Sequence, residues 1–273
     1  MYRSNHARRG STNARTIVLV AFAAVVSIAA VIAWHAIRES LFQRRERALA
    51  SLSINNLKQI SLAIIQQEQQ ARKELISKNL NRMPNAAMDA ELIKKLHYQL
   101  PPAICRADGT PLLSWRVAVL PYIDDALYKR FHLDEAWDSP NNKELIADIP
   151  QIYCSPGRPN DGKTLYLVCV GEETPFPAHS IPATAGLLWN PGRIRVFEAD
   201  EEQAVPWTQP ADLVLRPGEA IHGVGHSRGV GFPAATGDGA AFFIRSTAPP
   251  DQLRQLFTSE GGRLDEQYRG YPE

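Results

Sequence analysis

The first third of the sequence lacks the two residues that most often interrupt helices. All 20 prolines lie at or after Pro84, and Gly10 is the only glycine before Gly109. Proline removes a backbone N–H and glycine adds backbone freedom, so their absence leaves this region free to form one long helix. The rest of the chain is divided into short elements by both residues.

Charge is absent between Ile17 and Trp34. A helix rises about 1.5 Å per residue, so residues 16–37 would span roughly 33 Å, enough to cross a hydrocarbon core of about 30 Å. The positive-inside rule gives only a weak preference because arginines flank both sides, but a short basic arm is most easily kept in the cytoplasm. We therefore predict a single-pass membrane protein with a basic cytoplasmic arm (1–15), a transmembrane helix (16–37), an amphipathic helix (38–80) and a periplasmic globular head (81–273).

Two other interpretations of the apolar segment stay open. A cleaved signal peptide has a shorter apolar core and small residues at its cleavage site, whereas Trp34 and His35 stand at those places here. A buried helix of a soluble protein needs polar residues on one face, and this segment has almost none. We favour the membrane anchor, with the lipid bilayer as the partner of residues 16–37.

Neither net charge nor cysteine content indicates a ligand. The net charge is +1, so no global basic field indicates nucleic acid. The three cysteines form no C-x-x-C motif, which argues against a structural zinc site or a thioredoxin-type site. A periplasmic domain could hold one disulfide, for which Cys154 and Cys169 are the candidate pair. The alternative is that these two and Cys105 are small, partly buried hydrophobic residues.

The helix expected after the apolar segment has two different sides. One carries apolar residues at three-, four- and seven-residue steps, interrupted by Ser53 and Gln67: Ala50, Leu57, Ile60, Ile64, Ala71 and Leu75. The other is polar: Arg44, Arg45, Lys58, Gln66, Gln69, Arg72 and Lys73. An apolar stripe must be covered, either by a sheet of its own domain or by a second copy in a coiled coil. We favour the first because the heptad pattern is imperfect.

The head is expected to be of the α+β class, with an antiparallel sheet and Pro/Gly-rich loops, because no regular βαβ alternation is visible. Predicted strands are Thr164–Val170, Arg193–Ala199 and Ala240–Arg245, and the last follows a tight turn at Asp238-Gly239. Predicted helices are Pro249–Phe257 and Asn141–Asp148, the latter capped by Ser139 with Pro140 at its start. The predicted core comprises Trp115, Leu120, Tyr122, Tyr128, Phe131, Trp137, Tyr153 and Trp207.

One group of residues could carry chemistry. Asp134, Glu135 and Asp138 lie near His132 and Trp137. Paired carboxylates beside an aromatic residue can hydrolyse sugars, and carboxylate oxygens can bind calcium. We favour a structural role, in which Trp137 packs, Asp138-Ser139-Pro140 cap a helix and the acids face solvent.

Other motifs are weaker. His222 and His226 have the spacing of two metal ligands on a helix, and Gly223 and Gly225 superficially resemble a dinucleotide loop, but so many glycines favour a flexible surface loop. A second acidic group is expected to form a solvated loop: Glu198, Asp200, Glu201 and Glu202. No G-x-S-x-G motif indicates a serine hydrolase. No cofactor is therefore expected.

Several segments, in order along the chain, resemble the bacterial family called domain of unknown function 1559, which is also labelled solute-binding-protein-like. They are Ser53–Ile64 (SINNLKQISLAI), Ser114–Cys154 with its stretch Phe131–Pro140 (FHLDEAWDSP), Ala204–Leu213 (AVPWTQPADL), Gly237–Ile244 (GDGAAFFI) and Ser259–Glu266 (SEGGRLDE). The resemblance marks Trp115, Phe131, His132, Asp134, Trp137, Asp138, Ser139, Pro140, Trp207, Asp238 and Gly239 as a structural motif. It implies a pilin-like fold, with a long helix laid on a small antiparallel sheet, and no established enzymatic activity.

The chain departs from the family pattern at two places. The usual prepilin leader has Phe after its Gly and Glu at the fifth position, whereas Gly10 is followed by Ser11 and the fifth position is Arg15. The resemblance alone therefore leaves open whether Gly10 is a cleavage point and whether the protein polymerises. Near the C-terminus the pattern has His or Gly where this chain has Arg228. We expect a non-enzymatic pilin- or pseudopilin-like protein, related in design to type II secretion components and able to self-associate. Alternatives are an anchored binding module for a sugar, peptide or calcium, and an anchored hydrolase.

Overall fold

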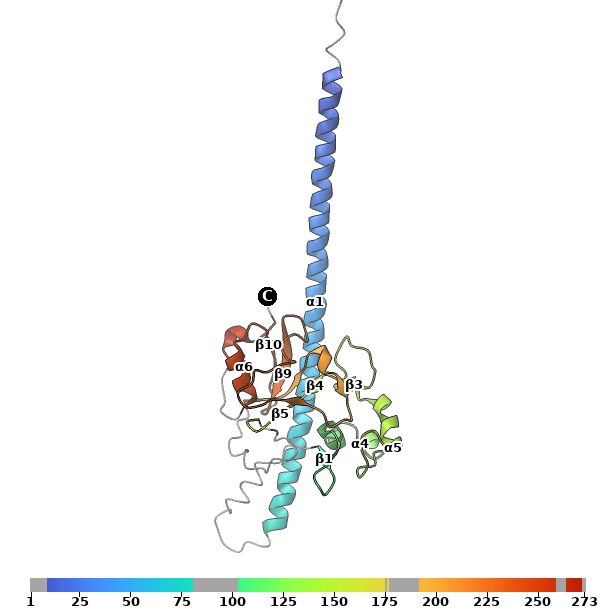
Figure 1. Ribbon diagram of the computed structural model, residues 1–273, viewed down its shortest axis with the longest axis vertical. Coiled ribbons are helices and arrows are strands. Elements are labelled where there is room, and N and C mark those ends of the chain that lie inside the picture. The colour runs from blue at the N-terminus through green and yellow to red at the C-terminus, as the bar shows by residue number, and fades with distance from the viewer. Residues whose placement is uncertain (1–8, 81–102, 175, 177–191, 259–263, 272–273) are drawn as a thin grey trace, which may run out of the picture. The chain divides into compact units, whose positions relative to one another are not determined.

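A computed structural model of the protein describes residues 9–80, 103–174, 176, 192–258 and 264–271, with side chains from residue 16 onward except those of residues 72, 75 and 78–80. The chain forms two compact units, Met1–Ala48 and Leu49–Glu273. Helix α1 (Arg9–Leu80) contributes to both, and we call the described residues from Ala103 onward the head (Figure 1). Of the predicted cytoplasmic arm, residues 1–8 lie outside the described residues.

The first unit consists of the early part of α1. The helix begins at Arg9 rather than at residue 16, so Gly10 lies within it. The large apolar side chains from Ile17 to Phe42 are all more than half exposed, and the least exposed of them is Val26 at 51%. Within the described residues this segment is therefore exposed, unlike the buried helix of a soluble protein. Among the described residues, one helix is long and apolar enough to cross a membrane, judged by length and composition.

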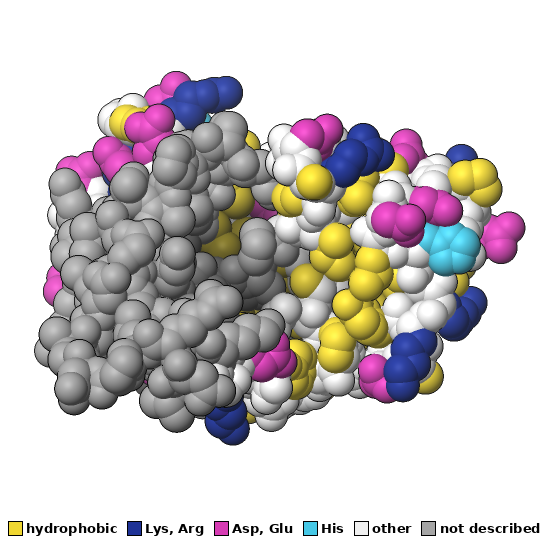
Figure 2. All heavy atoms as spheres, turned by 90° about the horizontal axis from the view of Figure 1, so that it is seen from below, with side chains coloured by type: hydrophobic (Ala, Val, Ile, Leu, Met, Phe, Trp, Pro, Cys, Tyr) yellow, Lys and Arg dark blue, Asp and Glu magenta, His cyan; other side chains and the backbone are white. Residues whose placement is uncertain are grey.

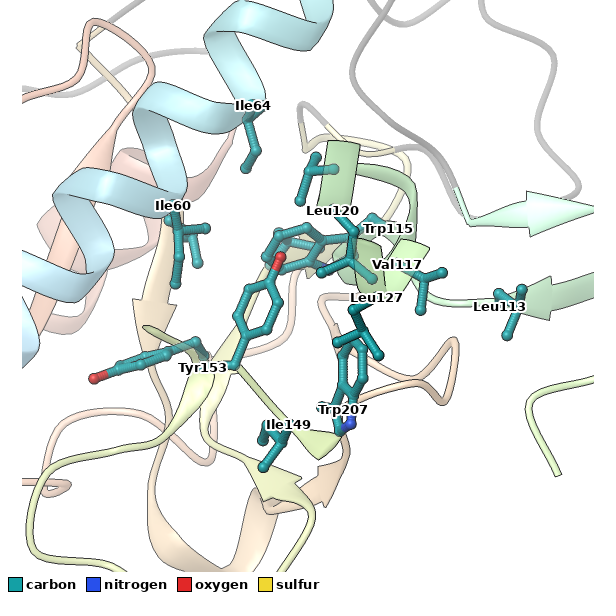
Figure 3. Packing of buried hydrophobic residues seen from close by; sticks show 14 of the residues in the cluster. Ile60, Ile64, Leu113, Trp115, Val117, Leu120, Leu127, Ile149, Tyr153 and Trp207 are labelled. Atoms are coloured by element: carbon teal, nitrogen blue, oxygen red, sulfur yellow. The ribbon is translucent and has the colours of Figure 1, made fainter. Parts of the chain in front are cut away.

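In the second unit, the later part of α1 buries its apolar stripe in the head. Leu57, Ile60 and Ile64 are fully buried and Ala50 nearly so. Ile60 and Ile64 point toward Leu120 and the aromatic rings of the core (Figure 3). The stripe therefore packs on its own domain, as predicted. Lys58, Gln66, Gln69 and Lys73 on the other side are exposed, and the side chains of Arg72 and Leu75 lie outside the described residues.

The main sheet of the head has four antiparallel strands in the order β10-β9-β6-β4. Strands β6 (Ile194–Glu198) and β10 (Ala241–Arg245) were predicted, as was the turn at Asp238-Gly239 that joins β9 (Gly231–Thr236) to β10. Gly239 has a positive φ of 86°, and its N–H donates to the carbonyl of Thr236. Strand β9 was not predicted because Pro233 lies inside it. Strand β6 pairs with β9 only from residue 234 onward, so the missing N–H of Pro233 removes no bond of that pairing.

The predicted single strand Thr164–Val170 is wrong. It is divided into β3 (Lys163–Thr164), β4 (Tyr166–Leu167) and β5 (Cys169–Val170), which pair with three different partners. The hydroxyl of Thr164 accepts a hydrogen bond from the N–H of Tyr166, and such local bonds interrupt extended strands. The smaller sheets pair β3 with β7 (Val205–Pro206), β5 in parallel with β8 (Leu213–Val214), and β1 (Ile104–Cys105) with β2 (Pro111–Leu113).

Short helices fill the remaining turns. Pro140–Glu144 forms α5, with Ser139 as its cap and Pro140 as its first residue, as predicted, but the predicted helix then continues as the 3-10 turn η2 (Leu145–Asp148). The predicted helix at 249–257 is α6 (Pro250–Phe257). The other described helices and 3-10 turns are α3 (Trp115–Ala118), η1 (Leu120–Tyr122), α4 (Asp125–Tyr128), η3 (Gln151–Tyr153), η5 (Glu201–Gln203) and η6 (Glu266–Tyr268).

The head has two hydrophobic clusters. The first contains the α1 stripe and the predicted core residues Trp115, Leu120, Phe131, Tyr153 and Trp207. The rings of Tyr153 and Trp207 stack with centroids 5.8 Å apart (Figure 3). Two predicted core residues, Tyr128 and Trp137, are half-buried at the margin of this cluster, and Tyr122 is half-buried outside it.

The cysteines do not pair. Cys154 belongs to the first cluster, whereas Cys169 belongs to the second, which is built from Phe197, Phe232, Phe257 and their neighbours. All three cysteines are free thiols, and Cys105 is exposed. The suggested Cys154–Cys169 disulfide is therefore wrong, because each residue fills space in a different part of the core.

Candidate functional site

The most unusual feature of the head is a buried ion pair between Glu198 on β6 and Arg228 in the loop before β9. Glu198 is fully buried and Arg228 is 6% exposed. The guanidinium binds both carboxylate oxygens, with Nη2–Oε1 at 2.5 Å and Nε–Oε2 at 3.1 Å. Nη2 also donates to the hydroxyl of Ser155, and Nη1 donates to the carbonyl of Pro156. Ser155 also donates to Glu198.

The network extends from this pair to α1. Ser53 Oγ donates to Glu198 Oε2 at 2.7 Å and lies 3.0 Å from the hydroxyl of Tyr166. Because the single proton of Ser53 goes to the carboxylate, Tyr166 must donate to Ser53. Asn56 then donates to Tyr166 and, with its other N–H, to the carbonyl of Cys154. We call these residues the Glu198 network: Ser53, Asn56, Ser155, Tyr166, Glu198 and Arg228.

Burial and the neighbouring charges shift the pKa values of the acidic groups in this network. Burial raises the pKa of the Glu198 carboxyl, while the Arg228 guanidinium and the serine hydroxyls oppose that shift. Burial also raises the pKa of Tyr166, and the neighbouring Glu198 charge adds to the effect. Ser53, Ser155 and Glu198 are each 4% exposed or less. The network therefore joins five chain segments and presents no exposed nucleophile.

The prediction that the acids after β6 form a solvated loop is partly wrong. Glu198 belongs to the strand and Asp200 is 9% exposed, whereas Glu201 and Glu202 are exposed as predicted. Asp200 accepts a hydrogen bond from the N–H of His226 at 2.7 Å. Burial raises the pKa of Asp200, and this bond opposes the shift.

A second buried ion pair joins Arg116 on α3 to Asp212 before β8. Arg116 Nη2 lies 2.8 Å from Asp212 Oδ1, and the two side chains are 0% and 9% exposed. The same carboxylate oxygen accepts bonds from the indole N–H of Trp115 and the backbone N–H of Val168. Burial raises the pKa of Asp212, and the Arg116 charge opposes it.

This second pair takes the place of a neighbouring strand beside β4. Arg116 Nε donates to the carbonyl of Tyr166 at 2.9 Å, and Asp212 accepts from Val168 N at 3.0 Å. An adjacent strand would supply the same N–H donor and oxygen acceptor. Two of the segments that carry the family resemblance, Ser114–Cys154 and Ala204–Leu213, thus meet at one ion pair that closes a sheet edge.

Three further polar residues of α1 bind the head. Ser61 donates to the carbonyl of Thr236 at 2.8 Å, and Gln67 donates to the carbonyl of Ala118 at 3.1 Å. Glu68 pairs with Arg195 on β6 at 3.0 Å, where the arginine side chain is 1% exposed. Ser53 and Gln67, which interrupt the apolar stripe in the sequence, are therefore among the residues that hold the helix in register with the head.

The motif Phe131–Pro140 is held by a side chain outside it. Asn142 is fully buried, and its amide oxygen accepts from the N–H of His132 at 3.0 Å. Its amide nitrogen donates to the carbonyls of His132 and Ala136 at 2.9 and 3.0 Å, and to that of Glu135 at 3.3 Å. The motif thus forms a loop closed around one asparagine.

The acidic candidates of that motif do not form a metal site. Asp134 and Asp138 are exposed, and Glu135 pairs with His132 at 3.0 Å. Hydrogen bonds from Ser139 and His132 lower the pKa of Glu135. In the described part of the chain, no three His, Cys, Asp or Glu side chains gather in a way that could hold a metal ion. Trp137 packs against the first cluster, in keeping with its predicted structural role.

The glycine-rich segment 222–231 is not a detached surface loop. His222 and His226 are exposed, but Gly223 accepts from the N–H of Asp200 and Arg228 is buried. A strand, β9, follows the glycines, whereas a dinucleotide loop would lead into a helix. Sequence reasoning noted Arg228 only as a departure from the family pattern and missed Arg116, Asp212 and Asn142. A charged residue inside an apolar run, as in Ser114–Leu120 (SWRVAVL), was the available signal.

The described surface gives no sign of a nucleic-acid site on the face seen in Figure 2. Acidic and basic side chains are interspersed there, with hydrophobic side chains between them. A nucleic-acid surface concentrates lysine and arginine in one patch. The mixture of acidic and basic side chains on this face is therefore consistent with the near-zero net charge of the chain.

These observations define a protein with one long N-terminal helix whose later part is bound to a small α+β head by buried polar contacts. The model of the family described as Protein of unknown function (DUF1559) matches residues 43–203, more than half of the chain, so the chain belongs to this family. No curated protein and no solved structure matches it.

Proposed function

We propose that this protein is a membrane-anchored, non-enzymatic structural or assembly component, similar in design to a pilin or pseudopilin. Residues 16–37 would cross the bilayer, with the N-terminal arm in the cytoplasm and the head in the periplasm. The observation that carries the proposal is the change of character along α1. The helix is uncharged and exposed from Ile17 to Trp34, and from Leu57 to Ile64 its apolar stripe is buried in the head.

The paired state of the buried charges supports a role without catalysis. Catalytic sites use strongly perturbed groups that can reach a substrate. Here Glu198 and Asp212 each have an arginine partner and lie within the head. Such pairs position chain segments. The function would therefore be carried out by the outer surface of the head.

The anchor is tested by introducing charge into its centre. The double variant Val25→Arg/Ile28→Arg places two cations in the apolar segment, each costing about 2.5–3.5 kcal/mol at the centre of a membrane helix. We expect the wild-type chain to remain in the membrane pellet after alkaline carbonate washing and the double variant to be lost from it. Gln66→Arg, at an exposed position of the later helix, is the matched control. Extraction of the wild-type chain by carbonate would contradict the proposal.

The mature N-terminus, measured by mass spectrometry on native membranes, distinguishes the routes to the membrane. A start at Met1 or Tyr2 means a permanent anchor. A start at Ser11 means prepilin-type processing despite the absence of the leader glutamate. A start beyond Trp34 means a cleaved signal peptide and excludes the anchor.

A further inference from the structure

The two edges of the four-stranded sheet are closed in different ways. An open strand edge is a template for pairing with another chain, so proteins cover their edges. The edge at β4 is closed from inside by the buried Arg116–Asp212 pair. The edge at β10 is closed by residues 264–271, which we call the edge segment.

The edge segment makes few main-chain contacts with β10. Its one bridge pairs Arg269 with Ile244, whereas β9 pairs with β10 at five positions. The N–H of Gly270 donates to the carbonyl of Phe243 at 2.9 Å, and Arg245 Nε donates to the carbonyl of Gly270 at 3.0 Å. A single bridge is a much weaker attachment than a five-residue ladder.

Side chains supply most of the remaining attachment. The Arg269 guanidinium lies 4.6 Å from the ring centre of Phe242, and the rings of Phe243 and Tyr271 are 4.8 Å apart. Leu264 is buried in the second cluster, but four residues between it and Tyr271 are exposed: Asp265, Glu266, Gln267 and Gly270. Tyr268 packs against the margin of the second cluster, so displacement of the segment after Leu264 uncovers that margin and leaves Leu264 and the fully buried residues in place.

We propose that the edge of β10 is a strand-addition site, and that a second copy of β10 binds there when the edge segment is displaced. Ala240 accepts from Thr236 on β9, so the alternate residues 241, 243 and 245 direct their main-chain groups outward. The bond from Gly270 to Phe243 confirms this outward direction. Two copies related by a two-fold axis can therefore continue one sheet across the interface.

The sequence of β10 suits pairing with itself. Residues Ala241–Ile244 are uncharged, and Arg245 at the end of the strand carries the one charge of β10, so the first four residues lack the charges that usually block edge association. Antiparallel pairing centred on Phe243 places Arg245 of each copy opposite Ala241 of the other, so the two cations do not meet. The edge segment thus competes with a second copy for the same hydrogen-bonding groups.

The test is the mass of the detergent-solubilised chain with residues 265–273 deleted, measured by light scattering with the detergent contribution subtracted. We expect twice the number of copies per particle compared with the full-length chain. A synthetic peptide of residues 264–271 should reverse the doubling, and adding Ala241→Pro to the deletion should prevent it, because Ala241 directs its N–H away from β9.

A second variant keeps the chain full length. Arg269→Ala/Tyr271→Ala removes both ring contacts of the edge segment, and we expect a fraction of doubled particles that rises with protein concentration. Masses equal to wild type in both the deletion and this variant would overturn the proposal. So would doubling that neither the peptide nor Ala241→Pro affects, because association would then use another surface. The outcome is independent of the proposed anchor, since every contact involved lies within the head.

Discussion

At the scale of single residues, the head depends on charged and amide side chains buried where each can satisfy several partners. Glu198 accepts from Ser53, Ser155 and Arg228, and Asn142 bonds to a loop of the chain through both of its amide atoms. Removing one partner of such a group leaves the other without its hydrogen bonds, which costs more than the net value of the bond. Two predictions follow from this asymmetry.

The first concerns the Glu198 network. Arg228→Met leaves the Glu198 carboxylate buried without its cation, and breaking a buried pair costs about 3–5 kcal/mol of unfolding free energy. The double variant Glu198→Gln/Arg228→Met should regain part of that loss. The measurement is urea unfolding of the full chain in detergent, with tryptophan fluorescence as the signal that reports unfolding.

The matched control for that experiment is Arg216→Met. Arg216 pairs with Glu219 at the surface, where the two side chains are 69% and 55% exposed. Exposed pairs contribute less than about 1 kcal/mol, so this variant should unfold close to wild type. If Arg216→Met and Arg228→Met lower the free energy of unfolding equally, the buried network contributes no more to stability than an exposed ion pair.

The second residue-scale prediction concerns Asn142. Asn142→Ala leaves the carbonyls of His132 and Ala136 without their donor, at a cost of about 1–3 kcal/mol. We expect faster proteolysis within residues 131–138 and a change in the fluorescence of the half-buried Trp137. Asn141→Ala, at the neighbouring half-buried position, should have a smaller effect. A loop that resists protease equally in both variants would contradict the role assigned to Asn142.

At the scale of elements, the later part of α1 is stabilised by the face it buries. Ile60→Ala removes a fully buried side chain from the first cluster, and such truncations cost about 2–5 kcal/mol. Leu62→Ala, two residues further along the same helix, removes a side chain that is 43% exposed and should cost under about 0.5 kcal/mol. Comparable unfolding midpoints for the two variants would mean that the stripe does not hold the helix to the head.

Elements with a strong local pattern were predictable from the sequence. The absence of proline and glycine predicted the long helix, the stripe of Leu57, Ile60 and Ile64 predicted its buried face, and Ser139-Pro140 predicted the start of α5. Strand β9 was missed because Pro233 argues against a strand, although it lies beyond the residues paired with β6. The stretch Thr164–Val170 was predicted as one strand because β-branched and aromatic residues cannot reveal which partner each will pair with.

The candidate site was less predictable than the fold elements. The aromatic and acidic residues of Phe131–Pro140 attracted attention because their chemistry is versatile, yet Asp134 and Asp138 face solvent. The arginines that hold the head together are far from their partners in the sequence: Arg116 is 96 residues from Asp212, and Arg228 is 30 residues from Glu198. These pairs meet only through tertiary structure. Arginine also occurs mostly at surfaces, so its identity alone does not indicate burial.

At the scale of the whole molecule, the chain combines an exposed apolar helical segment with a head whose buried charges are paired. Family membership extends over residues 43–203 and leaves the role of the head unassigned. The proposed anchor would place the head at the membrane surface. The edge of β10 is the surface proposed for contact between copies. Both proposals treat the outside of the head as the functional part.

The most direct test of the anchored, outward-facing head uses a native thiol. Cys105 is exposed while Cys154 and Cys169 are buried, so a membrane-impermeant maleimide reports on one position of the head. In sealed spheroplasts we predict labelling of the wild-type chain that does not increase after lysis and that Cys105→Ser abolishes. Labelling that appears only after lysis would place the head in the cytoplasm and contradict the account.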